Sequence, residues 1–334
     1  MIVLNNIKKI VSIKLILLLA SCGSVYEEKD TDTNENLVNS FHSFICNDYK
    51  KIPSFSSGSG MDFYNGFFYL VGDDDPFLVK VNTSGKINQK WEIWDSSAAK
   101  SGRIPKKIKP DFEAISVFPC KNDTLLLIFG SGSKSPNRDV ILSFNTKNEE
   151  VYPLNGEQFF AWLKTTAQLS NSEINLEGAT FIENTLYLFN RHNNEVYAIP
   201  QQQMERFISD QNTEELTLER YHFELPVFQG DTARFSSAAS INGAHTILFS
   251  ASIETTNDWE EDGAILGSFI GKIDLKNLQD KIPFCVPVFQ NDSTRFEGKI
   301  EGVHGFVGKK NELTIYFITD DDDGTTGWGR ISME

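Results

Sequence analysis

Three glutamates occupy matching places in three strand-like segments, where a carboxylate is unexpected. Glu113 opens "EAISVF", Glu177 opens "EGATFI" and Glu301 opens "EGVHGF". Because side chains alternate along a strand, Glu177 should point to the same face as Ala179 and Phe181. A charge on an apolar face needs a compensating partner. Carboxylate oxygens can bind a divalent cation, so the three glutamates are candidate metal ligands; guanidinium groups or water are the alternative partners.

The segments that carry these glutamates belong to a repeat that runs along the whole chain. Its unit is a short strand with a small residue near its start, a turn with Asn or Gly, a strongly apolar strand and one or two more strands. Five copies begin at Ser59, Glu113, Glu177, Ser237 and Glu301, in steps of 54 to 64 residues. Such steps fit four-stranded propeller blades, so we predict an all-β fold, a five-bladed β-propeller.

The fifth copy ends at Glu334 after roughly three strands, which leaves one blade incomplete. A strand-like segment at 41–53, "FHSFICNDYKKIP", precedes the first copy and is predicted to supply the missing outer strand. Closing the ring matters because it protects the edges of the sheets. A six-bladed propeller is the alternative, with the extra blade in 156–171 or 201–217. Both of these tracts have helix-period apolar residues instead of strand alternation.

In a propeller, the first strand of each blade lines the central channel, so the five starts should converge in a ring. Three carboxylates at close range raise one another's pKa unless a cation compensates them. Calcium is the predicted cofactor, because it accepts six to eight hard oxygen ligands in loose geometry. The predicted metal ligands are Ser59, Glu113, Glu177, Ser237 and Glu301.

Basic residues on the predicted rim of this ring suggest an anionic ligand. Arg191 and Arg234 are predicted to bind it, since arginine forks match phosphate oxygens. His192, in the same loop as Arg191, is predicted to be a proton-transfer group near the channel. Ordinary salt bridges, for example between Arg234 and Asp231, are the competing interpretation. No nucleophile elbow, Walker loop or His-Glu-x-x-His motif occurs in the sequence.

The order Ser, Glu, Glu, Ser, Glu over five blades, together with "SGMDFYNGFFYLVGDD", resembles the calcium-activated apyrase family, five-bladed nucleotidases with a central calcium. This resemblance implies a central calcium site at the five ring residues. Gly60 stands where that family has an acid in its first blade, and the family's catalytic loops are not recognisable here. The chain is also similar to phytase-like and SdiA-regulated propellers, and to an uncharacterised bacteroidete-type lipoprotein propeller family.

Two functions are therefore predicted for the propeller. The first is a calcium-dependent hydrolase of phosphorylated or ester-linked small molecules. The second is a non-enzymatic module that binds a small-molecule ligand or a protein partner, in which the ring serves stability alone. We expect a monomer in either case.

The first residues resemble a lipoprotein signal peptide. Lysines flank the apolar run "IVSIKLILLLASC", which is too short for a membrane span, and it ends in a lipobox-like tetrad at Cys22. We predict a signal peptide at 1–21, lipidation of Cys22, an acidic tether at 22–38 and a propeller domain at 39–334. The predicted location is the outer membrane, with contact to the bilayer through the lipid anchor only.

The charge balance excludes one class of partner. The chain carries 31 basic and 46 acidic residues, a net charge of −15, so nucleic acid and anionic membrane surfaces are not expected to bind. Three further cysteines, Cys46, Cys120 and Cys285, lie far apart without metal-site spacing, and we predict free thiols.

Overall fold

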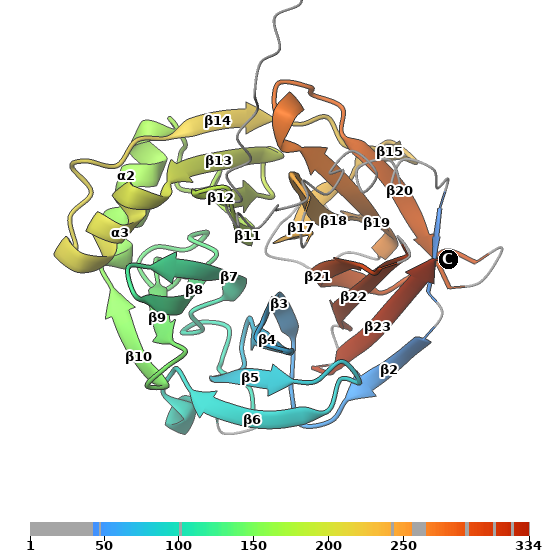
Figure 1. Ribbon diagram of the computed structural model, residues 1–334, viewed down its shortest axis with the longest axis horizontal. Helices are drawn as coiled ribbons and strands as arrows, with labels where there is room; N and C mark the ends of the chain where they lie inside the picture. Colours follow the sequence, from blue (N-terminus) through green and yellow to red (C-terminus); the bar gives the residue numbers. More distant parts are fainter. Residues whose placement is uncertain are drawn as a thin grey trace, which may run out of the picture. The chain divides into compact units, whose positions relative to one another are not determined.

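Short apolar strands separated by polar turns assemble into five antiparallel blade sheets in this computed structural model (Figure 1). The structure describes residues 43–46, 48–99, 102–241, 244–255, 265–290, 294–309, 312–321 and 324–333. The five sheets follow one another along the chain and surround a common centre. The predicted five-bladed, all-β propeller is confirmed.

Each blade is a meander whose first strand lies innermost (Figure 1). Blade 1 contains β3 (Gly58–Tyr64), β4 (Phe67–Gly72), β5 (Phe77–Val81) and β6 (Ile87–Glu92). Blade 2 contains β7 (Phe112–Cys120), β8 (Asp123–Gly130), β9 (Ile141–Asn145) and β10 (Glu150–Leu154). Blade 3 contains β11 (Leu176–Ile182), β12 (Thr185–Asn190), β13 (Glu195–Pro200) and β14 (Glu219–His222). Blade 4 contains β17 (Arg234–Ser240), β18 (Thr246–Glu254), β19 (Ile265–Asp274) and β20 (Phe284–Phe289).

Blade 5 is completed by the N-terminal part of the chain, as predicted. It contains β21 (Lys299–Val307), β22 (Leu313–Asp320), β23 (Thr326–Met333) and β2 (Asp48–Ile52). Strand β2 pairs antiparallel with β23, and the register joins Asp48 to Arg330 and Ile52 to Thr326. A two-residue strand, β1 (Phe44–Ile45), pairs parallel with β20 of blade 4. Strands β1 and β2 therefore connect blade 4 to blade 5.

The inner strand of every blade carries a β-bulge at its start, where one residue is extra to the pairing with the second strand. The extra residues are Ser59, Glu113, Glu177, Ser236 and Glu301. A bulge bends a strand and re-aims the side chain at that point. In blade 4 the equivalent position is therefore Ser236, one residue before the predicted Ser237.

Small residues follow the bulged position because neighbouring inner strands approach closely there. A Cβ added at Gly178 would lie 2.8 Å from the backbone nitrogen of Ala238 in the next blade. A Cβ at Gly302 would lie 2.8 Å from the Cβ of Met61. Real Cβ contacts are longer, so these positions require glycine, which explains the repeated "EG" and "SG" pairs in the sequence.

Two helices occupy the tracts that a sixth blade would have needed. They are α2 (Gly156–Thr166) and α3 (Gln201–Asp210); elsewhere in the part of the chain that the structure describes, the helical turns are short 3-10 segments at Ser96–Ala98 and Leu275–Asn277. Phe159 and Phe160 of α2 and Phe207 of α3 are fully buried between blades 2 and 3. The helical prediction is thus confirmed for both tracts. In the described ranges, no helix has the length and apolarity needed to cross a membrane.

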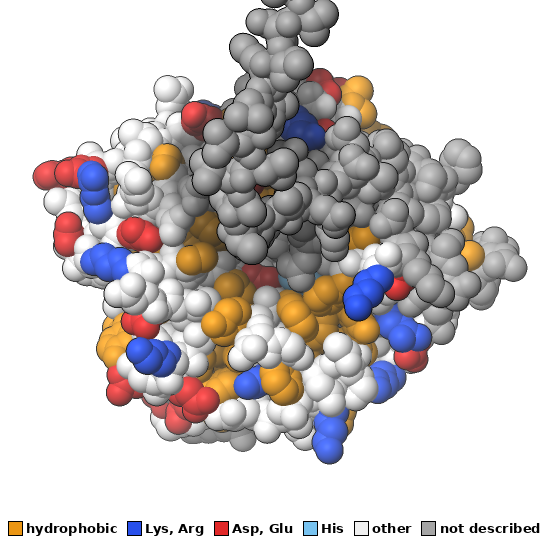
Figure 2. Space-filling view, in the orientation of Figure 1, with side chains coloured by type: hydrophobic (Ala, Val, Ile, Leu, Met, Phe, Trp, Pro, Cys, Tyr) orange, Lys and Arg blue, Asp and Glu red, His pale blue; other side chains and the backbone are white. Residues whose placement is uncertain are grey.

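The core consists of five apolar clusters, each built from side chains of two neighbouring blades. A further hairpin, β15 (Val227–Phe228) with β16 (Asp231–Thr232), leads into blade 4. On the face shown in Figure 2, basic and acidic side chains are scattered around the periphery without a single-sign patch. Signal peptide, Cys22 and tether all lie outside the described residues and stay predictions.

Candidate functional site

A highly charged cavity lies where the starts of the inner strands meet the loops after the second strands. Its volume is about 340 Å³, within the size range of small-molecule sites. The charged residues that line it are Asp73, Asp74, Arg103, Lys106, Lys109, Asp111, Glu113, Lys134, Arg138, Glu177, Arg191, Glu254, Lys299, Glu301 and Asp320. These are eight carboxylates and seven cations, so most charge is compensated within the protein.

The three predicted glutamates converge in this cavity. Glu177 and Glu301 are buried, with 6% and 3% of their surface exposed, and Glu113 is partly exposed. All three line the cavity, so the inner strands of blades 2, 3 and 5 converge there. Ser59 and Ser237 are also buried but do not line it.

The serines at the bulged positions bind neighbouring backbone. The hydroxyl of Ser59 donates to the carbonyl oxygen of Phe112, the residue before Glu113. In the same way, the hydroxyl of Ser236 donates to the carbonyl of Ile300, the residue before Glu301, at 2.7 Å. Each serine thus fixes the strand that carries the next blade's glutamate, which is a structural role.

We therefore expect Ser59→Ala to lower the free energy of unfolding by about 1–3 kcal/mol, because it removes the hydroxyl that donates to the carbonyl of Phe112, and Ser236→Ala to lower it less, because Ser250 also donates to the carbonyl of Ile300. Neither substitution should change the response of the protein to calcium. Chemical denaturation with and without calcium measures both effects. If Ser59→Ala keeps its stability but loses the response to calcium, Ser59 is a metal ligand and the structural role is wrong.

In blades 1 and 4, where the bulged residue of the inner strand is a serine, the end of the second strand supplies a carboxylate instead. Asp73 directly follows β4 in blade 1, and Glu254 ends β18 in blade 4. Both line the cavity beside the three glutamates. Asp74, Asp111 and Asp320 also line the cavity, and every blade contributes one further carboxylate: Asp73, Glu113, Glu177, Glu254 and Glu301. We call these five residues the carboxylate ring.

Three buried cations are interleaved with the carboxylate ring. The Nζ of Lys109 contacts Asp73 and lies 2.7 Å from Asp111. The Nη2 of Arg191 lies 2.6 Å from Glu254, and its Nε lies 3.8 Å from Glu177.

Lys299 completes this set. Its Nζ lies 2.5 Å from Glu301 and 3.3 Å from Glu254. Glu254 therefore shares two cations, Arg191 and Lys299, with the glutamates on either side. The charge of Glu177 is thus compensated by the guanidinium of Arg191, as the sequence analysis considered. The charge of Glu301 is compensated by the ammonium of Lys299.

The ring carboxyls differ sharply in acidity. Burial raises the pKa of Glu113 well above its usual value, and the charges of Glu177, Asp111 and Glu301 raise it further. Burial also raises the pKa values of Glu177 and Glu301, although Arg191 and Lys299 oppose the shift. For Glu254, burial is outweighed by the attraction of Lys299 and Arg191, which lowers its pKa to about 2.

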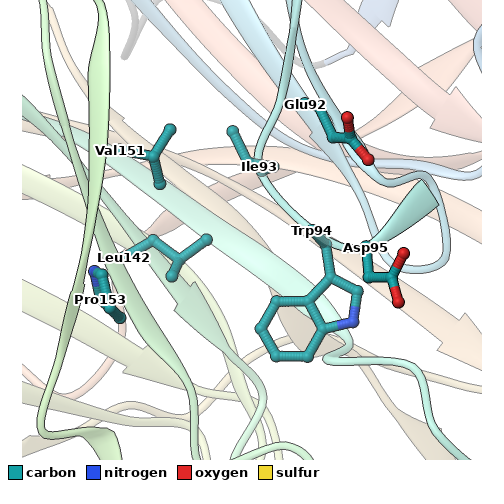
Figure 3. Close-up of a pocket in the computed structure, with 7 residues that line it drawn as sticks. All are labelled: Glu92, Ile93, Trp94, Asp95, Leu142, Val151 and Pro153. Atoms are coloured by element: carbon teal, nitrogen blue, oxygen red, sulfur yellow. The ribbon is translucent and has the colours of Figure 1, made fainter. Parts of the chain in front are cut away.

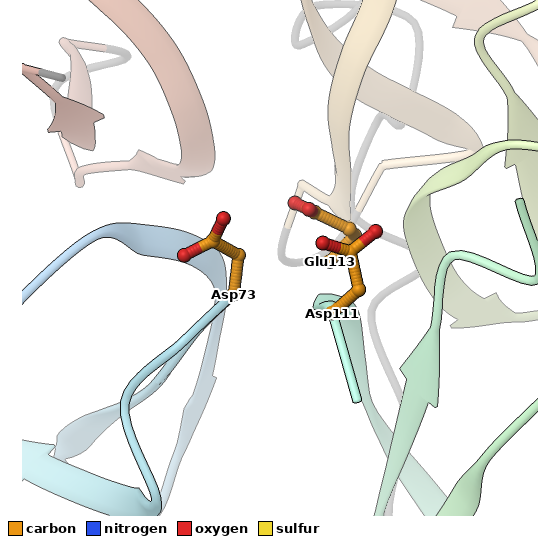
Figure 4. A group of neighbouring side chains, drawn as sticks. All are labelled: Asp73, Asp111 and Glu113. Atoms are coloured by element: carbon orange, nitrogen blue, oxygen red, sulfur yellow. The ribbon is translucent and has the colours of Figure 1, made fainter. Parts of the chain in front are cut away.

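Glu113 is distinguished from the rest of the ring by its partners. Within the described part of the chain, it makes no hydrogen bond or ion pair. Ligand oxygens of Asp73, Asp111 and Glu113 all lie within 4.8 Å of one another. Figure 4 shows Asp73 in the loop after β4, on one side, and Asp111 and Glu113 at the start of β7, on the other. This corner is the part of the cavity best suited to a cation.

Calcium fits the donor set of this corner, because all three side chains offer hard oxygens. A bound ion would share Asp73 and Asp111 with the Lys109 ammonium, whose own pKa the two carboxylates raise despite burial. Burial raises the pKa of Asp73 to about 6, so cation binding there would displace protons.

Of the predicted ligand-binding residues, which are Arg191, Arg234 and the proton-transfer candidate His192, Arg191 alone lines the cavity. Arg234 is half-buried and donates to the backbone carbonyl of His192, so its guanidinium links the start of blade 4 to the β12–β13 loop of blade 3. Burial, followed by the charge of Arg234, lowers the pKa of His192. No ion pair joins Arg234 to Asp231 among the described contacts.

Two segments of the sequence match closely, "PVFQGDTARF" at 226–235 and "PVFQNDSTRF" at 287–296. The guanidinium of Arg295, in the second segment, lies 3.9 Å from the ring centre of Phe228, in the first. Such cation–π contacts hold the two blade connections together. The interpretation of these repeats as blade-joining motifs is favoured. Asp292 lies outside the described residues.

A second hollow lies on the outer side of blades 1 and 2. It is lined by Glu92, Ile93, Trp94, Asp95, Leu142, Val151 and Pro153. Figure 3 shows Leu142, Val151 and Pro153 facing Ile93 and Trp94 across it. The two carboxylates are satisfied locally, since Glu92 accepts from the amide of Ser96 and Asp95 from that of Ser97. This groove is apolar and lacks the converging polar groups of the axial cavity.

Comparison with known proteins places the chain in a family. Residues 54–332 match the model of the family of unknown function DUF6929. The chain belongs to this family. None of the curated proteins matches it. The matched range begins just after β2 and spans all five inner strands.

Solved propeller-like structures are similar at low identity. They include a Myxococcus xanthus glutaminyl cyclase, with 10% identity, a TM-score of 0.46 and coverage of 86% of this chain and 97% of that one. A Bacillus subtilis arabinanase has 10% identity, a TM-score of 0.42 and coverage of 84% and 94%. Virginiamycin B lyase from Staphylococcus aureus has 12% identity, a TM-score of 0.37 and coverage of 85% and 99%. Likeness at this level says nothing about the chemistry of this chain.

Sequence reasoning missed part of the charged network, although a signal for it exists. Lys109, Asp111 and Glu113 alternate along one segment, as do Lys299 and Glu301. Residues two apart on an extended strand share a face, so Glu301 has the ammonium of Lys299 beside it, whereas Lys109 contacts Asp111 and not Glu113. Asp73 and Glu254 carry no such signal, because their place depends on how the second strands pair.

Proposed function

We propose that the axial cavity binds a calcium ion together with an anionic, phosphorylated small molecule. The observation that carries this proposal is Glu113, a ring carboxylate without an ion-pair partner in the described chain, close to Asp73 and Asp111. Cations on the cavity wall near its exposed side, Lys106 and Lys134, suit the anionic part of such a ligand.

Calcium should raise the melting temperature of the protein, because folded protein alone presents the site. At a hundredfold excess over the dissociation constant, this linkage stabilises by about 2.7 kcal/mol. Glu113→Gln should remove most of that stabilisation. In chelator the sign reverses, since the raised pKa of Glu113 means that ionising it costs folded-state stability as the pH rises.

Thermal melts in calcium and in chelator, between pH 5 and pH 8, measure both effects. Glu113→Gln should be at least as stable as the wild type in chelator at pH 8, and the two should converge as the pH falls. Glu215→Gln, in an exposed ion pair with Arg206, is the matched control. If calcium does not change the melting temperature of the wild type, the proposed calcium site is wrong. The carboxylates of the ring would then be compensated only by Lys109, Arg191 and Lys299.

Hydrolysis of the bound phosphoester or ester is a second candidate function, favoured by the spread of acidities in one cavity. Carboxyls whose pKa values are driven apart can divide acid and base roles; here Glu113 has a raised pKa and Glu254 a lowered one. A panel of phosphoester, nucleotide and carboxylic ester substrates, assayed in calcium and in chelator, tests it. Absence of turnover on the whole panel would leave the protein as a ligand-binding propeller, displayed on the membrane by a lipid at Cys22.

A further inference from the structure

Arg103 differs from the other two arginines that line the axial cavity. The side chains of Arg138 and Arg191 are only 16% and 11% exposed. Each of them uses a terminal guanidinium nitrogen for an ion pair with a cavity carboxylate, Asp111 or Glu254. The side chain of Arg103 is 42% exposed. Arg191, the predicted anion ligand, is therefore committed to the protein, and Arg103 is better placed to meet a ligand.

Two buried side chains hold the guanidinium of Arg103. Its Nε lies 2.6 Å from Oδ2 of Asp74, and its Nη2 donates to the hydroxyl of Ser57 at 3.1 Å. Asp74 is 5% exposed and Ser57 is fully buried. Both contacts use the edge of the planar group that Nε and Nη2 form. Among the contacts of the described residues, Nη1 makes no hydrogen bond, so the edge that Nη1 and Nη2 form can still donate.

Gly324 leaves room beside this second edge. It belongs to the loop between β22 and β23 of blade 5, and a Cβ added there would lie 2.9 Å from Nη1 of Arg103. Its φ of +78° is also one that residues with a side chain rarely adopt. No side chain at position 324 therefore covers the end of the guanidinium.

The charges of the cavity wall favour an anion near Arg103. The wall as a whole has one more carboxylate than it has cations. In blades 3 to 5, three carboxylates share two cations, and these residues are Glu177, Glu254, Glu301, Arg191 and Lys299. Two further cations pair with two aspartates, and these are Lys109, Arg138, Asp73 and Asp111.

Apart from Glu113, what remains of the wall has an excess of one positive charge. It consists of three cations and two carboxylates, and these are Arg103, Lys106, Lys134, Asp74 and Asp320. Arg103 and Lys106 come from the same segment before β7. An anionic group that enters the cavity is therefore attracted to this set and repelled by the glutamates of blades 3 to 5.

We propose that Arg103 binds the phosphate group of the ligand through Nη1 and Nη2, and that Asp74 is the positioning residue that orients its guanidinium. The inference rests on the anionic ligand proposed above and names the group that recognises it; it does not depend on calcium. A guanidinium matches two phosphate oxygens with two parallel hydrogen bonds, whereas an ammonium acts as a point charge. Lys106 therefore adds attraction, and Arg103 adds orientation.

Isothermal titration of phenyl phosphate into the full chain, in chelator and again in calcium, tests this assignment. Arg103→Gln should bind phenyl phosphate about tenfold or more weakly than the wild type, and Arg103→Lys should restore little of the loss, because an ammonium lacks the fork. Lys107→Gln is the matched control. It removes one exposed positive charge from the same segment but outside the cavity, and it should match the wild type.

Asp74→Ala separates orientation from charge. Coulomb attraction alone predicts tighter binding of phenyl phosphate, because this substitution removes a negative charge beside the site. We expect weaker binding, by about threefold or more, because the guanidinium is no longer held in place before the ligand arrives. A thermal melt of each variant establishes that it is folded at the temperature of the titration.

The outcomes distinguish this inference from the proposed function. If Arg103→Lys binds phenyl phosphate as tightly as the wild type, recognition by the guanidinium fork is wrong while the anion site stands. If Asp74→Ala binds more tightly, Asp74 does not position Arg103. If the wild type does not bind phenyl phosphate, both this inference and the proposed anionic ligand are wrong, and the melts in calcium still decide the metal site by themselves.

Discussion

Arg191→Met should lower the free energy of unfolding by about 3–5 kcal/mol, because it removes one partner of a buried charge network and leaves the others uncompensated. The side chain of Arg191 is only 11% exposed, and it serves both Glu177 and Glu254. Its methylene stem is matched in volume by methionine, so the loss should come from charge rather than from packing. Urea denaturation at neutral pH measures the change.

The control for this prediction is Arg206→Met. Arg206 forms an ion pair with Glu215 in which both side chains are more than half exposed, at 58% and 63%. Exposed pairs contribute about 0–1 kcal/mol, so this variant should be nearly neutral. The deficit of Arg191→Met should also shrink at acid pH, where Glu177, whose pKa burial has already raised, becomes neutral. Equal losses in both variants would refute the buried network as a source of stability.

Removing β2 should be the most damaging truncation of the propeller. A chain that begins at residue 54 lacks the outer strand of blade 5 and exposes the edge of β23. It also loses Ile52, which is 2% exposed, and Tyr49, whose ring packs 5.3 Å from that of Phe296. We expect a loss of about 5 kcal/mol or more, a large part of the stability of an ordinary domain.

Melts and size-exclusion chromatography of two truncated chains test this prediction. A chain that begins at residue 43 keeps β1 and β2 and should melt cooperatively, as the full chain does. A peptide of residues 43–53, added to the chain that begins at 54, should restore part of the stability. If the chain from residue 54 melts at the same temperature as the chain from residue 43, closure by β2 is not what stabilises the ring.

The sequence was sufficient to predict the architecture because the signals for it repeat. Five strand starts at near-regular spacing predicted the blades, and the incomplete last copy predicted closure by the N-terminal segment. Helix-period apolar residues around Phe159 and Phe207 separated the true helices from a sixth blade. The repeated pattern in the sequence predicts the architecture correctly because each blade packs in the same way against the next.

The candidate site was only partly predictable, because it depends on register. Alignment of the repeats selected Ser237, whereas the bulge makes Ser236 the equivalent residue. Asp73 joins the ring because Gly58 pairs with Gly72, which brings the following residue to the cavity. The guanidinium of Arg234 turned to a backbone carbonyl instead of the cavity. Shifts of strand register by one residue and the directions of side chains cannot be predicted from the pattern of residue types alone.

Closure by β2 also sets an order of events during folding. The hydroxyl of Tyr49 donates to Asp321, a residue 272 positions further along the chain, so the two join only after synthesis has reached blade 5. Contacts between such distant residues carry a large loop-closure cost and form late. Until then, the first blades must fold as an open arc with unprotected strand edges, which are sites of aggregation. The residues of β2 are thus synthesised before the first blade but are among the last to reach their native partners, and the nascent chain depends on blade 5 to protect its strand edges.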